Sequence, residues 1–209
     1  MAETTNTQGC HALVLTAHCD DAELWAGGTL ARWSDEGLPC SVGIAFHDEI
    51  RREETARSAS ILNYEALFLE QGQTISAWIL DLLHKLRPKV LLTHPANDPH
   101  PDHQAVYRHT IEALTKFPYR RECPLRWYVF DSYYQTRSPS VWPMTVNISQ
   151  TMDRKMDALA QHGSQARSNL AHVARHSAAM AGMRVRQEYA EAFHPFDLLG
   201  RWPVLRELP

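Results

Sequence analysis

The sequence predicts an α/β protein, a Rossmann-like three-layer sandwich in which helices cover both faces of a mostly parallel sheet. One observation is that short apolar runs, which suit buried strands, alternate with longer segments of helical character. The other is the composition, because 44% apolar and 22% charged residues in a chain of 209 are typical of a globular protein with a substantial core. We therefore expect one domain spanning residues 1–209.

The first half of the chain supplies four strand–helix units. Each unit begins with an apolar run that predicts a buried strand, and these runs lie at 11–17, 41–46, 66–69 and 90–93. Each run is followed by a predicted helix, and these helices lie at 20–36, 51–62, 75–86 and 103–114. The first three helices end at ordinary stop signals, namely Gly37, Asn63 and Pro88.

The alternation weakens after Phe117. Strands are predicted at 127–130 and 144–147, with a loop rich in Tyr, Ser and Pro between them. A helix is predicted at 149–162 with Ser149 as its N-cap, and a second helix at 175–192. Because strands and helices alternate along most of the chain, we expect the parallel sheet to be covered on both faces.

Composition and missing fingerprints exclude several classes of protein. The net charge of −3 argues against a nucleic-acid partner. The sequence has no dinucleotide-binding or P-loop glycine motif and no GxSxG nucleophile motif. The first apolar run is too short for a signal peptide or a membrane span, so we expect no membrane insertion and a cytoplasmic location.

Two short runs contain the residue types of a metal site. His18-Cys19-Asp20-Asp21 follows the first predicted strand, and His100-Pro101-Asp102-His103 closes the loop after the fourth. Ligands of open α/β sheets bind at the carboxyl ends of the strands, so both runs should meet there. Two histidines and a carboxylate that leave one position open for water form the ligand set of a hydrolytic zinc site, and Fe²⁺ also fits this set. The expected ligands are His18, Asp21 and His103.

The remaining residues of the two runs suit the hydrolysis of an amide. Asp20 adjoins the ligands but need not bind the metal, so it is free to act as general base. His100, if it stays off the metal, can face the oxyanion of a tetrahedral intermediate and later protonate the leaving amine. Asp102 would hold the His100 ring in the tautomer that this role requires.

At these residues the sequence resembles the LmbE-like (PIG-L) family of zinc-dependent deacetylases, whose members mostly act on N-acetylglucosamine conjugates. The family motif A-H-P-D-D-x-E is matched by residues 17–23 and continues into Gly27-Gly28-Thr29. The second motif, H-P-D-H with an Asp two residues before it, is matched by His100–His103 and Asp98. Weaker matches extend the likeness to residues 11–194, and they are Arg51 with Glu54, Lys155, His162 with Ser164-Gln165, and residues 189–193.

The resemblance implies roles for the matched positions. His18, Asp21 and His103 would be the zinc ligands, and Asp20 would be the general base. His100 would act on the oxyanion side, with Asp102 as the residue that tunes it. Arg51 would bind or orient the substrate, an N-acylated amino sugar or a similar small conjugate. A surface salt bridge between Arg51 and Glu54 is the alternative.

The sequence departs from the family pattern at two positions. Cys19 stands where the family has Pro. Either the turn tolerates the change, or the loop shifts, or a Cys19 thiolate competes for the metal. Asn63 replaces a Gly after the second helix, and Asn tolerates the left-handed conformation.

Several alternatives remain open at this stage. The chain could be an amidase that removes a larger acyl group, an oxidative enzyme with non-haem iron, or a sugar-binding protein without catalysis. The stretch 117–142, with Tyr119, Tyr133 and Tyr134, is the expected specificity region, although packing or an oligomer interface would also explain it. A homo-oligomer is compatible with the sequence.

Overall fold

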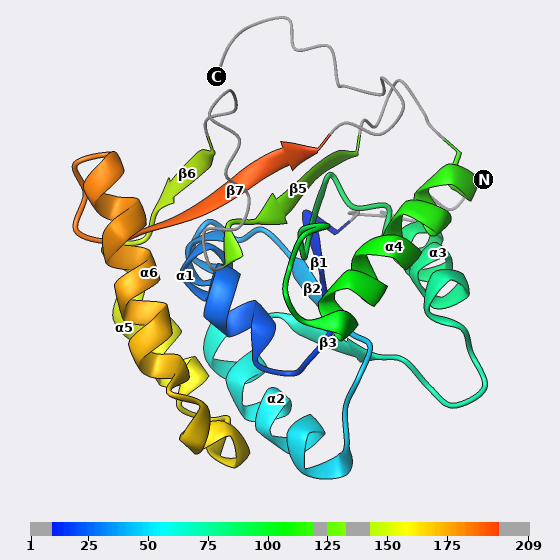
Figure 1. Ribbon diagram of the computed structural model, residues 1–209, viewed down its shortest axis with the longest axis horizontal. Coiled ribbons are helices and arrows are strands. Elements are labelled where there is room, and N and C mark those ends of the chain that lie inside the picture. The colour runs from blue at the N-terminus through cyan, green and yellow to red at the C-terminus, as the bar shows by residue number, and fades with distance from the viewer. Residues whose placement is uncertain (1–9, 119–124, 133–142, 197–209) are drawn as a thin grey trace, which may run out of the picture.

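The computed structural model describes residues 10–118, 125–132 and 143–196 (Figure 1). These residues form a sheet of seven strands in the order β3-β2-β1-β4-β5-β7-β6. The strands are β1 (Ala12–Thr16), β2 (Cys40–Ile44), β3 (Glu65–Phe68), β4 (Val90–Thr93), β5 (Arg126–Phe130), β6 (Met144–Asn147) and β7 (Ala190–Phe196). The strands β1 to β5 pair in parallel, and β7 pairs antiparallel with both β5 and β6.

Helices cover both faces of this sheet. On one side lie α3 (Ile75–Leu86) and α4 (Pro101–Lys116). On the other side lie α1 (Asp21–Asp35), α2 (Glu49–Leu62), α5 (Met152–Leu159) and α6 (Leu170–Arg184), with a 3₁₀ helix at Gly163–Ser168 (Figure 1). The predicted three-layer α/β fold with a mostly parallel sheet is therefore confirmed.

Alternating side chains of the central strands build a separate core on each face. In β1, Ala12 and Val14 pack into the core beneath α1, whereas Leu13 and Leu15 pack into the core beneath α3. All four side chains are fully buried, as expected of a parallel strand covered on both sides. The continuous apolar run at 11–17, without alternation, is the sequence signature of this double burial.

The reversal of strand order lies between β1 and β4. From β1 the chain continues to β2 and β3 on one side, and then crosses to β4 and β5 on the other. The loops after β1 and β4 consequently run in opposite directions and leave a crevice at the carboxyl ends of these two strands. This crevice is where both chemical motifs were expected.

Two predictions for the second half of the chain are wrong. The helix predicted from residue 149 begins at Met152, and Ser149 does not cap it because its hydroxyl donates to Asn147 Oδ1 at 2.8 Å. The helix predicted at 175–192 ends at Arg184, and residues 190–196 form β7 instead. Arg186 adopts a left-handed backbone with φ 57°, which ends helical geometry. The pairing of β7 with two strands then outweighs the helix propensity of Ala190 to Ala192.

Among the residues described, no helix is long and apolar enough to cross a membrane.

Candidate metal centre

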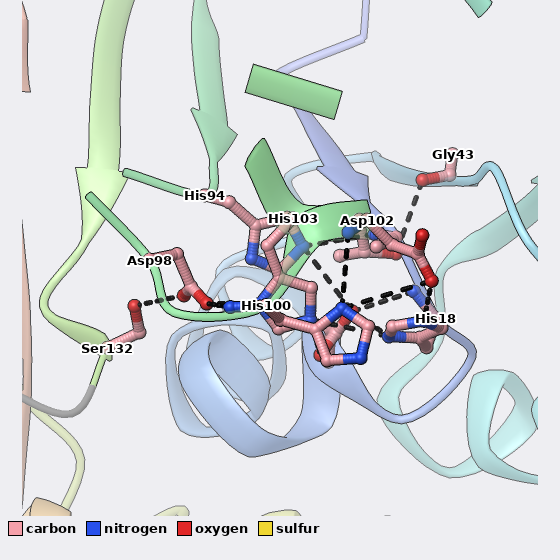
Figure 2. Close-up of polar contacts among 11 residues, drawn as sticks. His18, Gly43, His94, Asp98, His100, Asp102, His103 and Ser132 are labelled. Carbon is pink, nitrogen blue, oxygen red and sulfur yellow. Dashed lines mark hydrogen bonds and ion pairs between the residues drawn. The ribbon is translucent and has the colours of Figure 1, made fainter. Parts of the chain in front are cut away.

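The two motifs are held by the first turns of two helices that follow adjacent strands. After β1 the chain passes through His18 and enters α1 at Asp21. After β4 it passes through His94 and Asp98 and enters α4 at Pro101. A proline in the first turn of a helix is favourable because its missing N–H would have no helical partner there. Figure 2 shows that the side chains from both segments point toward one another.

The three expected ligands converge on one point. His18 Nδ1 lies 3.3 Å from His103 Nε2 and 3.6 Å from Asp21 Oδ2, and His103 Nε2 lies 3.3 Å from Asp21 Oδ1. Ligands at the usual ~2.0–2.2 Å from a tetrahedral zinc ion would be separated by about 3.3–3.6 Å. The spacing and the chemistry of these donors therefore fit a zinc ion. Two overlapping groups of donors meet here, His18/His100/His103 and Asp21/His94/His103.

Charge at the centre also favours a cation. Burial alone would raise the pKa of Asp21, but His94, His103 and His18 hold it well below its usual range. Burial likewise opposes the charged form of His103, yet the carboxylates of Asp21 and Asp98 raise its pKa to about 10. Without a metal, the proton on His103 supplies the positive charge that these carboxylates require. A metal that binds His103 Nε2 has to displace that proton.

Asp98 contacts the ring nitrogen of His103 that faces away from the other expected ligands. Its Oδ1 lies 2.9 Å from His103 Nδ1 and accepts a hydrogen bond from the His100 N–H at 3.0 Å. Its Oδ2 accepts a hydrogen bond from Ser132 at 2.7 Å. A carboxylate that fixes the second nitrogen of a metal-binding histidine selects its tautomer and orientation. In the sequence, Asp98 was recognisable only as part of the second motif. Its spacing from His103 was the only indication that the two residues interact.

His94 is a buried neighbour to which sequence reasoning gave no role. Its ring stacks on His103 with centroids 3.8 Å apart, and its Nε2 lies 3.3 Å from Asp21 Oδ2. Burial lowers the pKa of His94, although the nearby Asp21 carboxylate attracts its charged form. Its Nε2 accepts a hydrogen bond from the Ala17 N–H at 3.0 Å. His94 therefore ties the end of β1 to β4, and its position directly after a strand was the signal that pointed to it.

Asp20 lies beside the ligands without capping the helix that it precedes. Its side chain is buried, and this burial together with the neighbouring charge of Asp21 raises its pKa. Arg51 and His162 attract its charged form and oppose that rise. The Asp20 carboxylate is thus a buried group whose charge interacts with that of Asp21, its neighbour in the chain.

Asp102 has a different partner from the one expected. Its Oδ2 lies 3.0 Å from His18 Nε2 but 3.8 Å from His100 Nδ1. The backbone N–H of Asp102 donates to His100 Nδ1 at 3.2 Å, so the His100 proton must reside on Nε2. The backbone of Asp102 therefore sets the His100 tautomer, while its carboxylate contacts His18. The His100 side chain is 47% exposed and can reach a bound molecule.

Arg51 lies in the first turn of α2, on the Asp20 side of the centre. Among the ion pairs of the described residues, none joins Arg51 to Glu54, the alternative raised by the sequence. Glu54 instead accepts hydrogen bonds from the N–H and hydroxyl of Ser164, both at 2.7 Å. Arg51 is therefore available to interact with Asp20 or with a substrate.

The Cys19 thiol is buried, and burial raises its pKa to about 11, so it is protonated at neutral pH. This favours the interpretation that the turn tolerates Cys19 over a thiolate that competes for the metal. Asn63 adopts the expected left-handed conformation, with φ 57°. Tyr119, Tyr133 and Tyr134 of the expected specificity region lie outside the described residues.

Comparison with known proteins identifies the fold and the motif-bearing part of the chain. Residues 13–114 match the family model described as PIG-L: GlcNAc-PI de-N-acetylase. A Bacillus cereus protein named "Probable N-acetyl-alpha-D-glucosaminyl L-malate deacetylase 2" is 23% identical, over 77% of this chain and 86% of that protein.

Two solved structures have folds that are equally similar to the fold of this chain. The N,N'-diacetylchitobiose deacetylase of Pyrococcus horikoshii has a TM-score of 0.73 at 19% identity, over 93% of this chain and 86% of that one. GalB of Pseudomonas putida, a 4-carboxy-2-hydroxymuconate hydratase, has the same TM-score and identity, over 95% and 100% of the two chains. The fold is therefore shared by proteins of different activity, and the family assignment rests on the matched segment. Residues 13–114, which contain both motifs, match the model of the PIG-L (LmbE-like) family, the family that those motifs resemble.

Proposed function

We propose that this protein is a metal-dependent hydrolase that removes an N-acetyl or other N-acyl group from an amino sugar or a small amino-sugar conjugate. The observation that carries the proposal is the convergence of His18, Asp21 and His103 at one crevice, with Asp20 and His100 beside them. The PIG-L family match and the Bacillus cereus deacetylase support the same reaction and the same class of substrate.

We further propose zinc as the metal, held by His18 Nδ1, Asp21 and His103 Nε2, although Fe²⁺ would fit the same donors. A metal ion bound there would acidify a water molecule and polarise the carbonyl group of the amide. Asp98 and Asp102 contact the outer nitrogens of His103 and His18, and would hold both rings in the required orientation.

The residues around the ligands supply the proton transfers. Asp20 accepts a proton from the water that attacks the amide carbon, and its buried site favours a base of raised proton affinity. His100 presents its Nε2–H to the oxygen that becomes negative in the tetrahedral intermediate. When the carbon–nitrogen bond breaks, the departing amine takes up the proton that Asp20 received from the water, because His100 Nδ1 accepts the Asp102 N–H and the ring holds only the Nε2 proton. Arg51 holds the substrate on the α2 side.

An amidase that acts on a larger acyl group would use the same residues, so only assays with different acyl groups separate it from a deacetylase. The hydratase of the same fold is a further candidate, but the family match favours hydrolysis. The α/β sheet argues against the oxidative alternative, since the enzymes with an H-x-D…H iron site have all-β scaffolds. Asp20 and His100 are both present, which argues against a sugar-binding protein without catalysis.

We also propose that residues 1–209 form one domain of this type, because the similar structures align over most of both chains. A cytoplasmic location and a homo-oligomeric state stay predictions.

The decisive experiment measures metal content and amine release from N-acetylglucosamine-type substrates for the wild type and Asp20→Ala. We expect about one zinc per chain in both proteins, and a rate lower by about 10²–10⁴-fold in the variant because the general base is lost. Asp35→Ala, an exposed carboxylate at the other end of α1, is the matched control and should retain activity. Absence of bound metal, or hydration of an enol acid without amide hydrolysis, would contradict the proposal.

A further inference from the structure

His94 is a fully buried histidine that lies between the two motifs, and the proposed mechanism gives it no part. It is the first residue after β4, a strand that pairs with β1. Figure 2 shows its ring beside that of His103. A polar ring that is buried this completely requires an explanation in terms of its contacts.

Packing alone does not require an imidazole at this position. The ring of His94 contacts Phe130 of β5, with centroids 5.4 Å apart and ring planes at 80°. Within the described part of the chain, His94 Nδ1 has no hydrogen-bond partner. A buried polar atom without a partner is costly, and a phenyl ring would pack against the same neighbour without that cost. The contacts that favour an imidazole are therefore those of the other nitrogen, Nε2.

The Nε2 atom of His94 contacts the first motif at two points. It accepts a hydrogen bond at 3.0 Å from the N–H of Ala17, the residue before His18. It also lies 3.3 Å from Asp21 Oδ2, the oxygen that accepts a hydrogen bond from the His18 N–H at 2.7 Å. One nitrogen at the end of β4 thus meets both the backbone that leads into His18 and the carboxylate of Asp21.

The face of the same ring contacts the second motif. It stacks on the ring of His103, with centroids 3.8 Å apart and an angle of 14° between the planes. Asp98 Oδ1 holds His103 Nδ1 at 2.9 Å, and the stacked His94 ring restricts the tilt of the His103 ring plane. His103 Nε2 is consequently directed toward Asp21 Oδ1, which lies 3.3 Å away.

We propose that His94 is a positioning residue that holds Asp21 and His103, one expected ligand from each motif, at the separation that a metal ion requires. This role rests on the proposed function, in which both residues bind zinc. Ligands that are fixed before the metal arrives lose less conformational freedom when it binds. The loss of His94 should therefore appear as a loss of zinc affinity.

The test compares His94→Phe, which keeps a ring but removes Nε2, with His94→Gln, whose amide oxygen can accept the Ala17 N–H. Competition with a chelator of known affinity measures the affinity for zinc. We expect a loss of about 10–100-fold in His94→Phe, as for other partners of metal ligands, and a smaller loss in His94→Gln. His47→Phe is the matched control, because His47 Nε2 contacts the backbone oxygen of Leu69 at 2.9 Å, and this variant should keep its zinc affinity.

Urea denaturation of the zinc-free variants separates positioning from a general loss of structure. His94→Phe should be at least as stable as His94→Gln, because a phenyl ring leaves no buried polar atom unpaired. The two variants should therefore rank in opposite orders for stability and for zinc affinity. The same order in both measurements, or a loss of zinc affinity below tenfold in His94→Phe, would overturn the proposal. A wild type that binds zinc but releases no amine would refute the proposed function, and the comparison of zinc affinities would still decide the role of His94.

Discussion

The carboxylate of Asp102 contacts His18 Nε2, the ring nitrogen that faces away from the other ligands. If this contact orients a metal ligand, Asp102→Asn should weaken zinc binding by about 10–100-fold, as removal of such outer partners does elsewhere. Competition with a chelator of known affinity measures the change. If Asp102 instead acts on His100, the variant will keep its zinc affinity and lose only kcat.

His100→Asn is the control for this prediction, because it removes the ring that Asp102 was expected to tune. His100 lies at the rim with its side chain 47% exposed, so we expect its loss to leave zinc affinity within about threefold and to lower the rate. If both variants lost zinc affinity equally, His100 would be a metal ligand. This outcome is possible because His100 belongs to one of the two groups of donors.

At this scale the sequence predicted that the proposed ligands would lie together, but it did not predict the contacts of the residues around them. His18, Asp21 and His103 were predictable because each lies in a compact motif that follows a strand, and adjacent parallel strands bring their ends together. The contacts of Asp98 and His94 were harder to predict, because they depend on which side chains meet in the folded chain. The partner of Asp102 also depends on side-chain rotation at the start of α4, which spacing along the chain does not determine.

Helix α1 carries Asp21 and is packed too closely at Gly28 to accept a larger residue. A Cβ atom at Gly28 would lie 2.6–2.8 Å from three side-chain atoms of Ile148. Alanine should favour the helix by ~1 kcal/mol, but overpacking of this kind costs about 1–3 kcal/mol. We therefore expect Gly28→Ala to lower the free energy of unfolding, measured by urea denaturation.

The neighbouring Gly27→Ala is the matched control. Its Cβ would lie 3.0 Å from Lys155 Cγ, a milder overlap than the contacts of 2.6–2.8 Å at Gly28, so the loss should be smaller. Replacing Ile148 by Val in the Gly28→Ala background should recover part of the stability, because the two sites share one contact. If Gly28→Ala instead raised the free energy of unfolding, helix propensity rather than close packing would determine the effect of substitution at this position.

At the scale of elements, the sequence predicted the parallel half of the sheet and missed its antiparallel extension. Val90–Thr93 and Ile75–Leu86 match their predicted bounds because a buried strand and an amphipathic helix have strong periodic patterns. The first three residues of β7 fell within the helix predicted at 175–192, because Ala190, Glu191 and Ala192 favour helices locally. Pairing with β5 and β6 decides its conformation, and those partners are distant in the sequence.

Across the whole molecule, one buried ion pair joins the two halves. Lys155 of α5 lies against Glu191 of β7, and both are buried. The Glu191 carboxylate also accepts the N–H groups of Gly28 and Thr29, at 2.9 and 2.8 Å, and Lys155 donates to Leu24 O at 2.8 Å. The pair thus bridges the middle of α1, and it connects the late motif residues to the helix that begins at the metal centre.

This connection predicts an asymmetric response to mutation. Lys155→Met would leave the Glu191 charge buried without its cation, and should cost about 3–5 kcal/mol of unfolding free energy. In Lys155→Met/Glu191→Leu neither charge of the pair remains to be buried without its partner. The double variant should therefore be more stable than Lys155→Met alone. Urea denaturation measures the free energy of unfolding of both variants, provided that the m-value is unchanged. If the double variant is destabilised by the sum of the two single changes, the pair holds α1, α5 and β7 together through contacts other than charge.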